Sequence, residues 1–204
     1  ELLESLGGRS AVEHLLEQLS FSPSVLKGLV ARNLVRVEDE VVVRDPFASR
    51  PPSGGRRHQP TRDQQGVIDA LTTGSPGEVF LLHGITGSGK TLVYIELLER
   101  VVRERGKTAI VLVPEIALTP QTVDRFRQVF GDSIAVLHSA LSDGERYDAW
   151  LALQRGEKRI AVGARSAIFA PLSDLGAIIV DEEHESSYKQ AEAPRYHARE
   201  VAIV

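Results

Sequence analysis

Eight consecutive residues, 84 to 91, have the types and spacing of a loop that binds the phosphates of a nucleoside triphosphate. They match the pattern G-x-x-x-x-G-K-[ST] at every fixed position. Glycines allow the left-handed backbone that turns successive N–H groups toward phosphate oxygens. We expect Lys90 to reach the β and γ phosphates and Thr91 to bind the accompanying Mg²⁺ at the positive end of a helix. The predicted ATP-binding loop is Gly84, Ile85, Thr86, Gly87, Ser88, Gly89, Lys90 and Thr91.

An acidic segment after a short apolar run is a candidate for the second half of the same site. Residues 177–180 read Ala-Ile-Ile-Val, and Asp181-Glu182-Glu183-His184 follows directly. Hydrolysis needs one carboxylate to hold Mg²⁺, which we assign to Asp181, and one to orient or deprotonate water, which we assign to Glu182. An acidic turn would be the simpler interpretation in isolation. The phosphate loop in the same chain favours the catalytic one, with Lys90, Asp181 and Glu182 as catalytic residues.

Gln64 allows two interpretations. With Thr61 it forms the pattern of a capping box, in which its side chain closes the start of a helix. Alternatively, its amide pairs with a donor and an acceptor of adenine, which would make the site prefer ATP over GTP. The sequence leaves both open, and both could hold in different states.

Strand and helix patterns alternate after residue 60. We predict strands near 78–83, 108–113, 133–138, 158–162 and 177–180, and helices near 62–72, 91–105, 119–130 and 142–154. This alternation predicts an α/β fold with a parallel sheet of the RecA-like type found in P-loop NTPase lobes. Such sheets bind ligands beyond the carboxyl ends of their strands, where the phosphate loop is expected.

The domain boundary is expected in a segment without periodicity. Residues 46–60 are dense in proline, glycine and serine, as in exposed connectors. We therefore predict a small domain over 1–46, a linker over 47–60 and the ATP-binding lobe over 61–204. We expect the first domain to be truncated at its N-terminus and the ATP-binding lobe to be truncated at its C-terminus.

Three predicted helices and a hairpin in the first domain suggest a winged helix. The helices are Glu1–Leu6, Ser10–Leu19 and one that starts at Ser22-Pro23, and the hairpin pairs 34–37 with 41–43. The third helix is expected to bury Val25, Leu26, Leu29 and Val30. The basic residues available for contacts to DNA phosphates are Lys27, Arg32 and Arg36. The acidic hairpin tip opposes such contacts, so a spacer or protein-docking domain stays the alternative.

Composition limits the possible classes of protein. The chain of 204 residues has a net charge of −4 and no cysteine, which excludes disulfides and cysteine-ligated zinc within it. We expect no membrane association, because no apolar run approaches the ~18 residues of a membrane span. The protein is expected in the cytoplasm. Since the sequence starts at Glu1 and contains no methionine, we also expect it to be part of a longer protein.

Four strings in order resemble the superfamily 2 helicases. They begin at Gly84, Pro114, Gly163 and Asp181, and read GITGSGKT, PEIALTPQ, GARSAIF and DEEH. Further strings resemble, more narrowly, the helicases of bacterial replication restart. These are His138-Ser with Glu145-Arg, DEEHESSYKQ over 181–190 and RYHAR over 195–199.

This resemblance implies an ATP-driven 3′-to-5′ DNA helicase that recognises stalled forks and starts primosome assembly. ATP and Mg²⁺ would be its cofactors, with zinc only in a C-terminal part outside this chain. Its partners would be single-stranded and forked DNA, primosome proteins and single-strand-binding proteins, in the bacterial nucleoid. The DNA-contacting or coupling residues would be Thr119, Gln121, Arg165 and Ser166, and Tyr188, Lys189, Arg195 and Tyr196 of an aromatic-rich loop. Both tyrosines would stack on bases or, alternatively, pack against the lobe.

Two departures from the family pattern limit what the chain is expected to do alone. Position 164 is alanine where superfamily 2 proteins often have threonine, and the second motor lobe with its arginine finger is outside the chain. The fragment is therefore expected to bind ATP with little turnover. Two other functions remain open: a non-hydrolysing scaffold that binds DNA structures, and another superfamily 2 motor such as an RNA helicase or a restriction translocase.

Overall fold

The computed structural model describes residues 10, 12, 15–16, 22–37, 59–85, 87–139 and 141–204. The chain divides into two compact units, Glu1–Val42 and Val43–Val204. All strands of the described residues belong to the larger unit.

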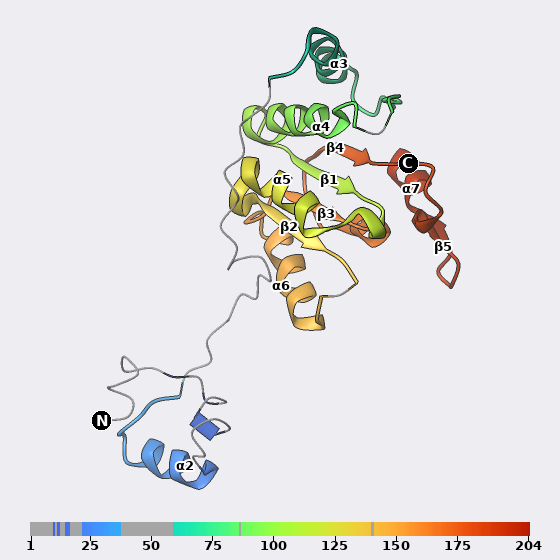
Figure 1. Ribbon diagram of the computed structural model, residues 1–204. Coiled ribbons are helices and arrows are strands. Elements are labelled where there is room, and N and C mark those ends of the chain that lie inside the picture. The colour runs from blue at the N-terminus through green and yellow to red at the C-terminus, as the bar shows by residue number, and fades with distance from the viewer. Residues whose placement is uncertain are drawn as a thin grey trace. The chain divides into compact units, whose positions relative to one another are not determined.

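A parallel four-stranded sheet forms the centre of the larger unit (Figure 1). Its strands are β1 (Thr108–Leu112), β2 (Ile134–Leu137), β3 (Ile160–Gly163) and β4 (Leu175–Val180), in the order β2-β3-β1-β4. Val111 of β1 pairs with Val162 on one side and with Ile179 on the other. The predicted RecA-like α/β fold is confirmed.

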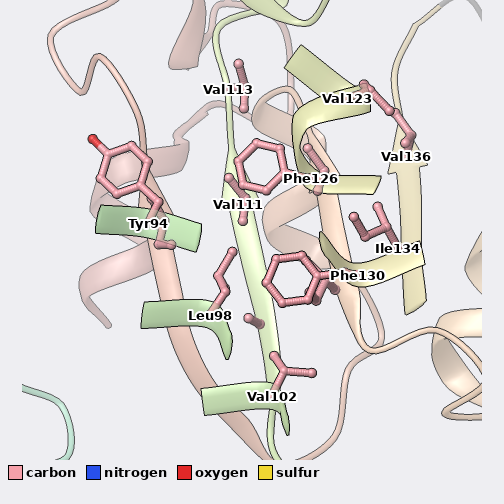
Figure 2. Close-up of a cluster of buried hydrophobic side chains, with 14 of the residues drawn as sticks. Tyr94, Leu98, Val102, Val111, Val113, Val123, Phe126, Phe130, Ile134 and Val136 are labelled. Atoms are coloured by element: carbon pink, nitrogen blue, oxygen red, sulfur yellow. The ribbon is translucent and has the colours of Figure 1, made fainter. Parts of the chain in front are cut away.

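Side chains alternate between the two faces of the sheet, because successive residues of a strand point in opposite directions. Ala109, Val111 and Val113 pack in one apolar cluster, and Ile110 and Leu112 pack in another. The first cluster is covered by two helices and contains Tyr94, Leu98, Val102, Val123, Phe126 and Phe130 (Figure 2). Leu153, Ala167, Ile168, Tyr188 and Ala198 cover the opposite face.

The helices of this unit largely follow the prediction. They are α3 (Arg62–Thr73), α4 (Lys90–Leu98), α5 (Pro120–Phe130), α6 (Asp143–Gln154) and α7 (Ala198–Ile203). Capping boxes close the starts of α3, through Thr61 and Gln64, and of α6, through Ser142 and Glu145. The helix predicted over 91–105 continues past α4 as the π-helix η2 (Glu99–Glu104).

Short elements connect the longer ones. Four 3₁₀ segments and an antiparallel pair of two-residue strands complete the unit: η3 (Glu115–Ala117), η4 (Gly131–Ser133), η5 (Arg165–Phe169), η6 (Ser186–Tyr188), β5 (Lys189–Gln190) and β6 (Tyr196–His197).

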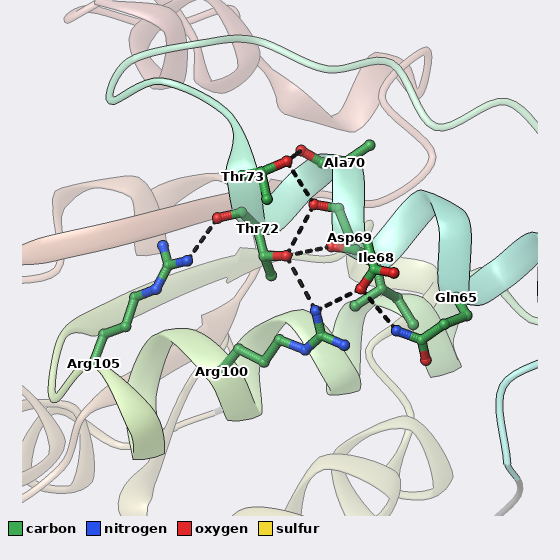
Figure 3. A network of polar contacts seen from close by, with 8 residues as sticks. All are labelled: Gln65, Ile68, Asp69, Ala70, Thr72, Thr73, Arg100 and Arg105. Carbon is green, nitrogen blue, oxygen red and sulfur yellow. Dashed lines mark hydrogen bonds and ion pairs between the residues drawn. The ribbon is translucent and has the colours of Figure 1, made fainter.

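A polar network attaches α3 to η2, the continuation of α4 (Figure 3). The Arg100 guanidinium donates to Asp69 Oδ1 at 2.9 Å and to Thr72 Oγ1 at 3.1 Å. Arg105 donates to the main-chain oxygen of Thr72 at 2.6 Å. The helix that precedes the phosphate loop is thereby held against the helix that follows it.

The predicted strand at 78–83 is wrong. These residues have no regular structure, and Val79, Phe80 and Leu81 are 63%, 42% and 78% exposed. The Glu78 N–H donates to the oxygen of Ser75 in a turn, and the Phe80 ring packs against Gly74. Among the described residues, β4 therefore pairs only with β1. A short apolar run predicts extended backbone, but it carries no information about a partner strand.

In the smaller unit, the helix predicted from Ser22-Pro23 is confirmed as α2 (Pro23–Ala31). Ser22 Oγ accepts from the Val25 N–H at 3.4 Å. The predicted buried face of this helix is wrong, since no residue of α2 is buried. Leu26 and Leu29 are half-buried, and Val25 and Val30 are exposed.

Other predictions for the first 60 residues fall largely outside the described residues. These are the helix over 1–6, most of the helix over 10–19, the strand 41–43 and most of the linker. Residues 34–37 are described and have no strand. The winged helix stays a prediction.

Replacing Gly163 with alanine should destabilise the larger unit. The added Cβ would clash with the main-chain oxygen of Leu137 and would lie 2.8 Å from the Ala167 Cβ, so two elements must shift. We expect the free energy of unfolding, measured with urea, to fall by about 1–3 kcal/mol.

Gly66→Ala is the matched control, because nothing lies within 4 Å of its added Cβ and the position is inside α3. This variant should gain about 0.5–1 kcal/mol, since alanine favours helix over glycine. Equal effects of the two substitutions would contradict the close approach at Gly163.

Candidate nucleotide-binding site

The predicted phosphate-binding loop leads directly into α4. Gly87 and Gly89 have φ angles of 82° and 87°, in the left-handed region that the pattern requires of its glycines. Gly89 is the N-cap of α4, and no side chain caps the helix. The first N–H groups of α4 therefore have no intrahelical acceptor and form a site for an anion. Thr86 of the predicted loop lies outside the described residues.

A cavity of about 340 Å³ lies beside this loop. It brings together residues that are far apart in sequence but were predicted to share one site. Its lining is Gly87, Gly89, Lys90, Thr91, Arg125, Asp181 and Glu182. The phosphate-binding and carboxylate parts of the predicted site thus meet in one cavity.

Lys90 lies along the inside of the loop. Its Nζ donates to the main-chain oxygen of Gly84 at 2.7 Å. The ammonium group therefore stays next to the loop backbone, where the phosphates are expected. Its positive charge partly opposes the rise in the pKa of Asp181 that burial causes.

Asp181 follows β4 and continues its pairing with β1, because its N–H donates to the oxygen of Leu112 at 2.9 Å. Its Oδ1 accepts from the Tyr94 hydroxyl at 3.2 Å and from the Glu182 N–H at 3.2 Å. Burial raises the pKa of Asp181, and the hydrogen bond from Tyr94 opposes this rise. Burial also raises the pKa of Tyr94, so the phenol stays a donor.

Glu182 has a left-handed backbone, with φ at 46°. This conformation is uncommon outside glycine and is typical of residues that the surrounding structure holds in place. The Glu185 N–H donates to the oxygen of Glu182 at 2.9 Å, and His184 Nε2 lies 3.8 Å from Glu182 Oε2. The tight turn directs the Glu182 side chain to the same cavity as Asp181.

Gln64 serves as the helix cap that one interpretation predicted. Its Oε1 accepts from the Thr61 N–H at 2.9 Å, and its own N–H donates to Thr61 Oγ1 at 3.3 Å. The sequence did not indicate a third contact, in which Gln64 Nε2 donates to the oxygen of Ser88 in the phosphate loop at 3.1 Å. The adenine interpretation stays a prediction.

Tyr188 lies in the core, where its exposed fraction is 1%. Its hydroxyl donates to the main-chain oxygen of Asp181 at 2.6 Å. Its ring packs in the apolar cluster on the face of the sheet opposite α4 and α5. For Tyr188, the structure therefore supports packing against the lobe, the alternative to base stacking. Tyr196 is half-buried, with its ring edge-to-face to that of Phe169 at 5.0 Å.

The other predicted DNA-contacting residues are divided between the two faces of the sheet. Thr119 caps α5 by accepting from the Thr122 N–H, and Gln121 is exposed on the same helix. On the elements of the other face, Arg165 donates to the oxygen of Lys189 at 3.1 Å, and Ser166 is exposed. Arg195 donates to the oxygen of Ala191.

Sequence reasoning missed three residues at this site. Tyr94 contacts Asp181, Arg125 lines the cavity, and Arg199 donates to Glu183 Oε2 at 2.6 Å. Arg199 is the last residue of the RYHAR string that carries the family resemblance, so the sequence did mark this position. Neither spacing nor residue type distinguished Tyr94 or Arg125 from other residues of amphipathic helices.

The side chains present fit Mg²⁺ that arrives with a nucleotide. Within the described ranges, no group of three or more His, Cys, Asp or Glu side chains could hold a metal ion. Mg²⁺ commonly takes one or two protein ligands together with phosphates and water. Thr91 and Asp181, which line the same cavity, provide such a pair. In the same part of the chain, no helix has the length and apolar character needed to cross a membrane.

Comparison with known proteins shows the family. The sequence model of the DEAD/DEAH box helicases matches residues 61–202, the range that contains the sheet and the cavity. The chain belongs to the DEAD/DEAH box helicase family.

Within that class, the sequence is similar to proteins called replication restart protein PriA. The one from Bacillus subtilis (strain 168) is 47% identical over 203 residues, which are 98% of this chain and 25% of the relative. That of Synechocystis sp. is 41% identical over 203 residues (98% and 24%), and that of Haemophilus influenzae 54% over 143 residues (70% and 20%). The chain spans about a quarter of the length of the first of these relatives. The resemblance to replication-restart helicases is confirmed.

Tyr188→Phe should separate packing from base stacking, because it keeps the ring and removes the hydrogen bond to Asp181. Without DNA, we expect the free energy of unfolding to fall by about 1 kcal/mol. Tyr188→Ala should cost about 3–5 kcal/mol, since it also empties part of the core. Urea unfolding measures both. An exposed, stacking tyrosine would instead leave stability nearly unchanged in both variants.

Proposed function

We propose that the chain contains the ATP-binding and ATP-hydrolysing lobe of a 3′-to-5′ DNA helicase. In this proposal, the complete protein recognises stalled replication forks and starts primosome assembly in the bacterial cytoplasm. The observation that carries the enzymatic part is the single cavity lined by Lys90, Thr91, Asp181 and Glu182. The names of the similar proteins support the role in replication restart.

The residues of the cavity divide the chemistry between them. The loop N–H groups and Lys90 bind the phosphates, and Thr91 and Asp181 hold the metal. Bound Mg²⁺ would neutralise charge that develops on the phosphate oxygens. Glu182 orients the attacking water and accepts its proton, for which its side chain must stay in the cavity. Its constrained left-handed backbone supports that role.

Coupling to DNA is proposed to run through the β5–β6 segment. Two contacts tie this part of the chain to the acidic segment: Tyr188 to the main chain of Asp181, and Arg199 to Glu183. Lys189 and Arg195 are exposed and cationic, as phosphate contacts require. A shift of this segment on DNA binding would therefore move the backbone that carries Asp181 and Glu182.

This lobe alone is proposed to bind ATP with little turnover. ATP sites of such motors close between two lobes, and a missing arginine finger costs roughly 10³- to 10⁵-fold in rate. A non-hydrolysing scaffold is less well supported, since it has no chemical need for Lys90, Asp181 and Glu182 together in one cavity.

The test is the ATPase activity of the complete protein while single-stranded DNA, forked DNA and RNA are titrated in turn. We expect forked DNA to stimulate hydrolysis, and Lys90→Ala to reduce the stimulated rate by about 100-fold or more, as for loss of a group that stabilises transition-state charge.

Lys107→Ala is the matched control, because this lysine pairs with Asp174 at 2.7 Å on the surface and does not line the cavity. It should leave the rate unchanged. A flat response to all three nucleic acids would favour the scaffold, and stimulation by RNA alone would favour another superfamily 2 motor.

A further inference from the structure

Arg125 is the one residue of the cavity lining that comes from α5. The buried residues of this helix are Val123, Phe126, Arg127 and Phe130. The three apolar ones pack on the sheet beside α4 (Figure 2). Arg125 points away from that face and is exposed. Its presence in the lining is therefore not explained by packing in the core.

The side chain of Arg125 has no hydrogen-bond or ion-pair partner among the residues that the structure describes. Other cations around the sheet are engaged: Arg100 with Asp69, Arg103 with Glu99, and Lys107 with Asp174. An unpaired guanidinium in a cavity that also contains Lys90 is a ready donor for an anion. Guanidinium groups match phosphate oxygens well, because they can donate two parallel hydrogen bonds.

The charges in the cavity also favour a second cation. Lys90 is the only other cationic residue of the lining, against the two carboxylates Asp181 and Glu182. A triphosphate adds about four negative charges, and one Mg²⁺ and one lysine leave part of this charge unbalanced. The loop N–H groups bind the inner phosphates and Lys90 reaches the β and γ phosphates, so the charge that is left unbalanced is mainly that of the terminal phosphate.

We propose that Arg125 is a phosphate-binding residue of the nucleotide site, which contacts the terminal phosphate of ATP from α5. This proposal rests on the proposed function, because it assumes that the cavity binds ATP. Because ADP lacks the terminal phosphate, this contact would let the lobe distinguish ATP from ADP.

The rigidity of α5 suits this role. The helix starts at its Thr119 cap, and Arg125 is six residues further on, about 9 Å along the axis. Phe126 and Phe130 are both buried and lie about one turn apart, and they hold the helix on the sheet directly after Arg125. The position of the Arg125 backbone relative to the loop is thus set by the same apolar cluster that positions α4.

The experiment measures binding of ADP and of a non-hydrolysable ATP analogue, both with Mg²⁺, to the complete protein by calorimetry. For Arg125→Gln we expect the dissociation constant of the analogue to rise about 10- to 100-fold, the usual range for a lost hydrogen bond to a charged group. The constant for ADP should change less than about 3-fold. Arg125→Lys, which keeps the charge, should lie between the wild type and Arg125→Gln.

Arg155→Gln is the matched control, since this exposed arginine caps the end of α6 and does not line the cavity. It should bind both nucleotides as the wild type does. Thermal unfolding of each variant shows whether the fold is retained, as expected for exposed positions.

The possible failures can be told apart. If Arg125→Gln binds the analogue like Arg155→Gln, or loses ADP and the analogue equally, the contact with the terminal phosphate is overturned. If the wild type binds neither nucleotide, or Lys90→Ala binds both as the wild type does, the proposed function itself fails.

Discussion

The parallel pairing of β1 with β4 is the constraint on which the candidate site depends. The ladder joins Leu112 to Val180 and is continued by the Asp181 N–H, which donates to the oxygen of Leu112. Because both strands end at this edge, the acidic segment leaves the sheet where α4 begins. A register shift of one residue would reverse the directions of the β4 side chains and break the contact between Tyr94 and Asp181.

Packing on one face of the sheet then decides which helices reach the site. One apolar cluster joins three elements around Val111. Leu98 of α4, Val102 of η2, and Phe126 and Phe130 of α5 all belong to it. This cluster places the starts of both helices near the carboxyl ends of the strands. As a result, the phosphate loop and Arg125 line the same cavity although 34 positions or more separate them in sequence.

The acidic segment is held from both faces of the sheet. Tyr94 donates to the carboxylate of Asp181 from α4, and Tyr188 donates to its main-chain oxygen from the opposite face. Arg199 adds an ion pair to Glu183. Between these contacts, Glu182 has a left-handed backbone that costs energy and is retained because its neighbours are fixed. A segment with so many anchors is a suitable place for distant contacts to act on the proposed hydrolysis of ATP.

The sequence by itself determined the α/β class and most helices, and it predicted that the glycine-rich loop at 84–91 and the acidic segment share one site, which agrees with the cavity that both line. Local patterns suffice for these features: glycines mark left-handed turns, Thr61 and Ser142 mark helix starts, and apolar periods mark elements. Only the tertiary structure decided that Tyr188 is buried, that Gln64 reaches the oxygen of Ser88, and that Arg125 and Tyr94 lie at the site. It also showed that 78–83 has no strand partner. These outcomes depend on which surfaces meet across the sheet, and a pattern along one segment does not contain that information.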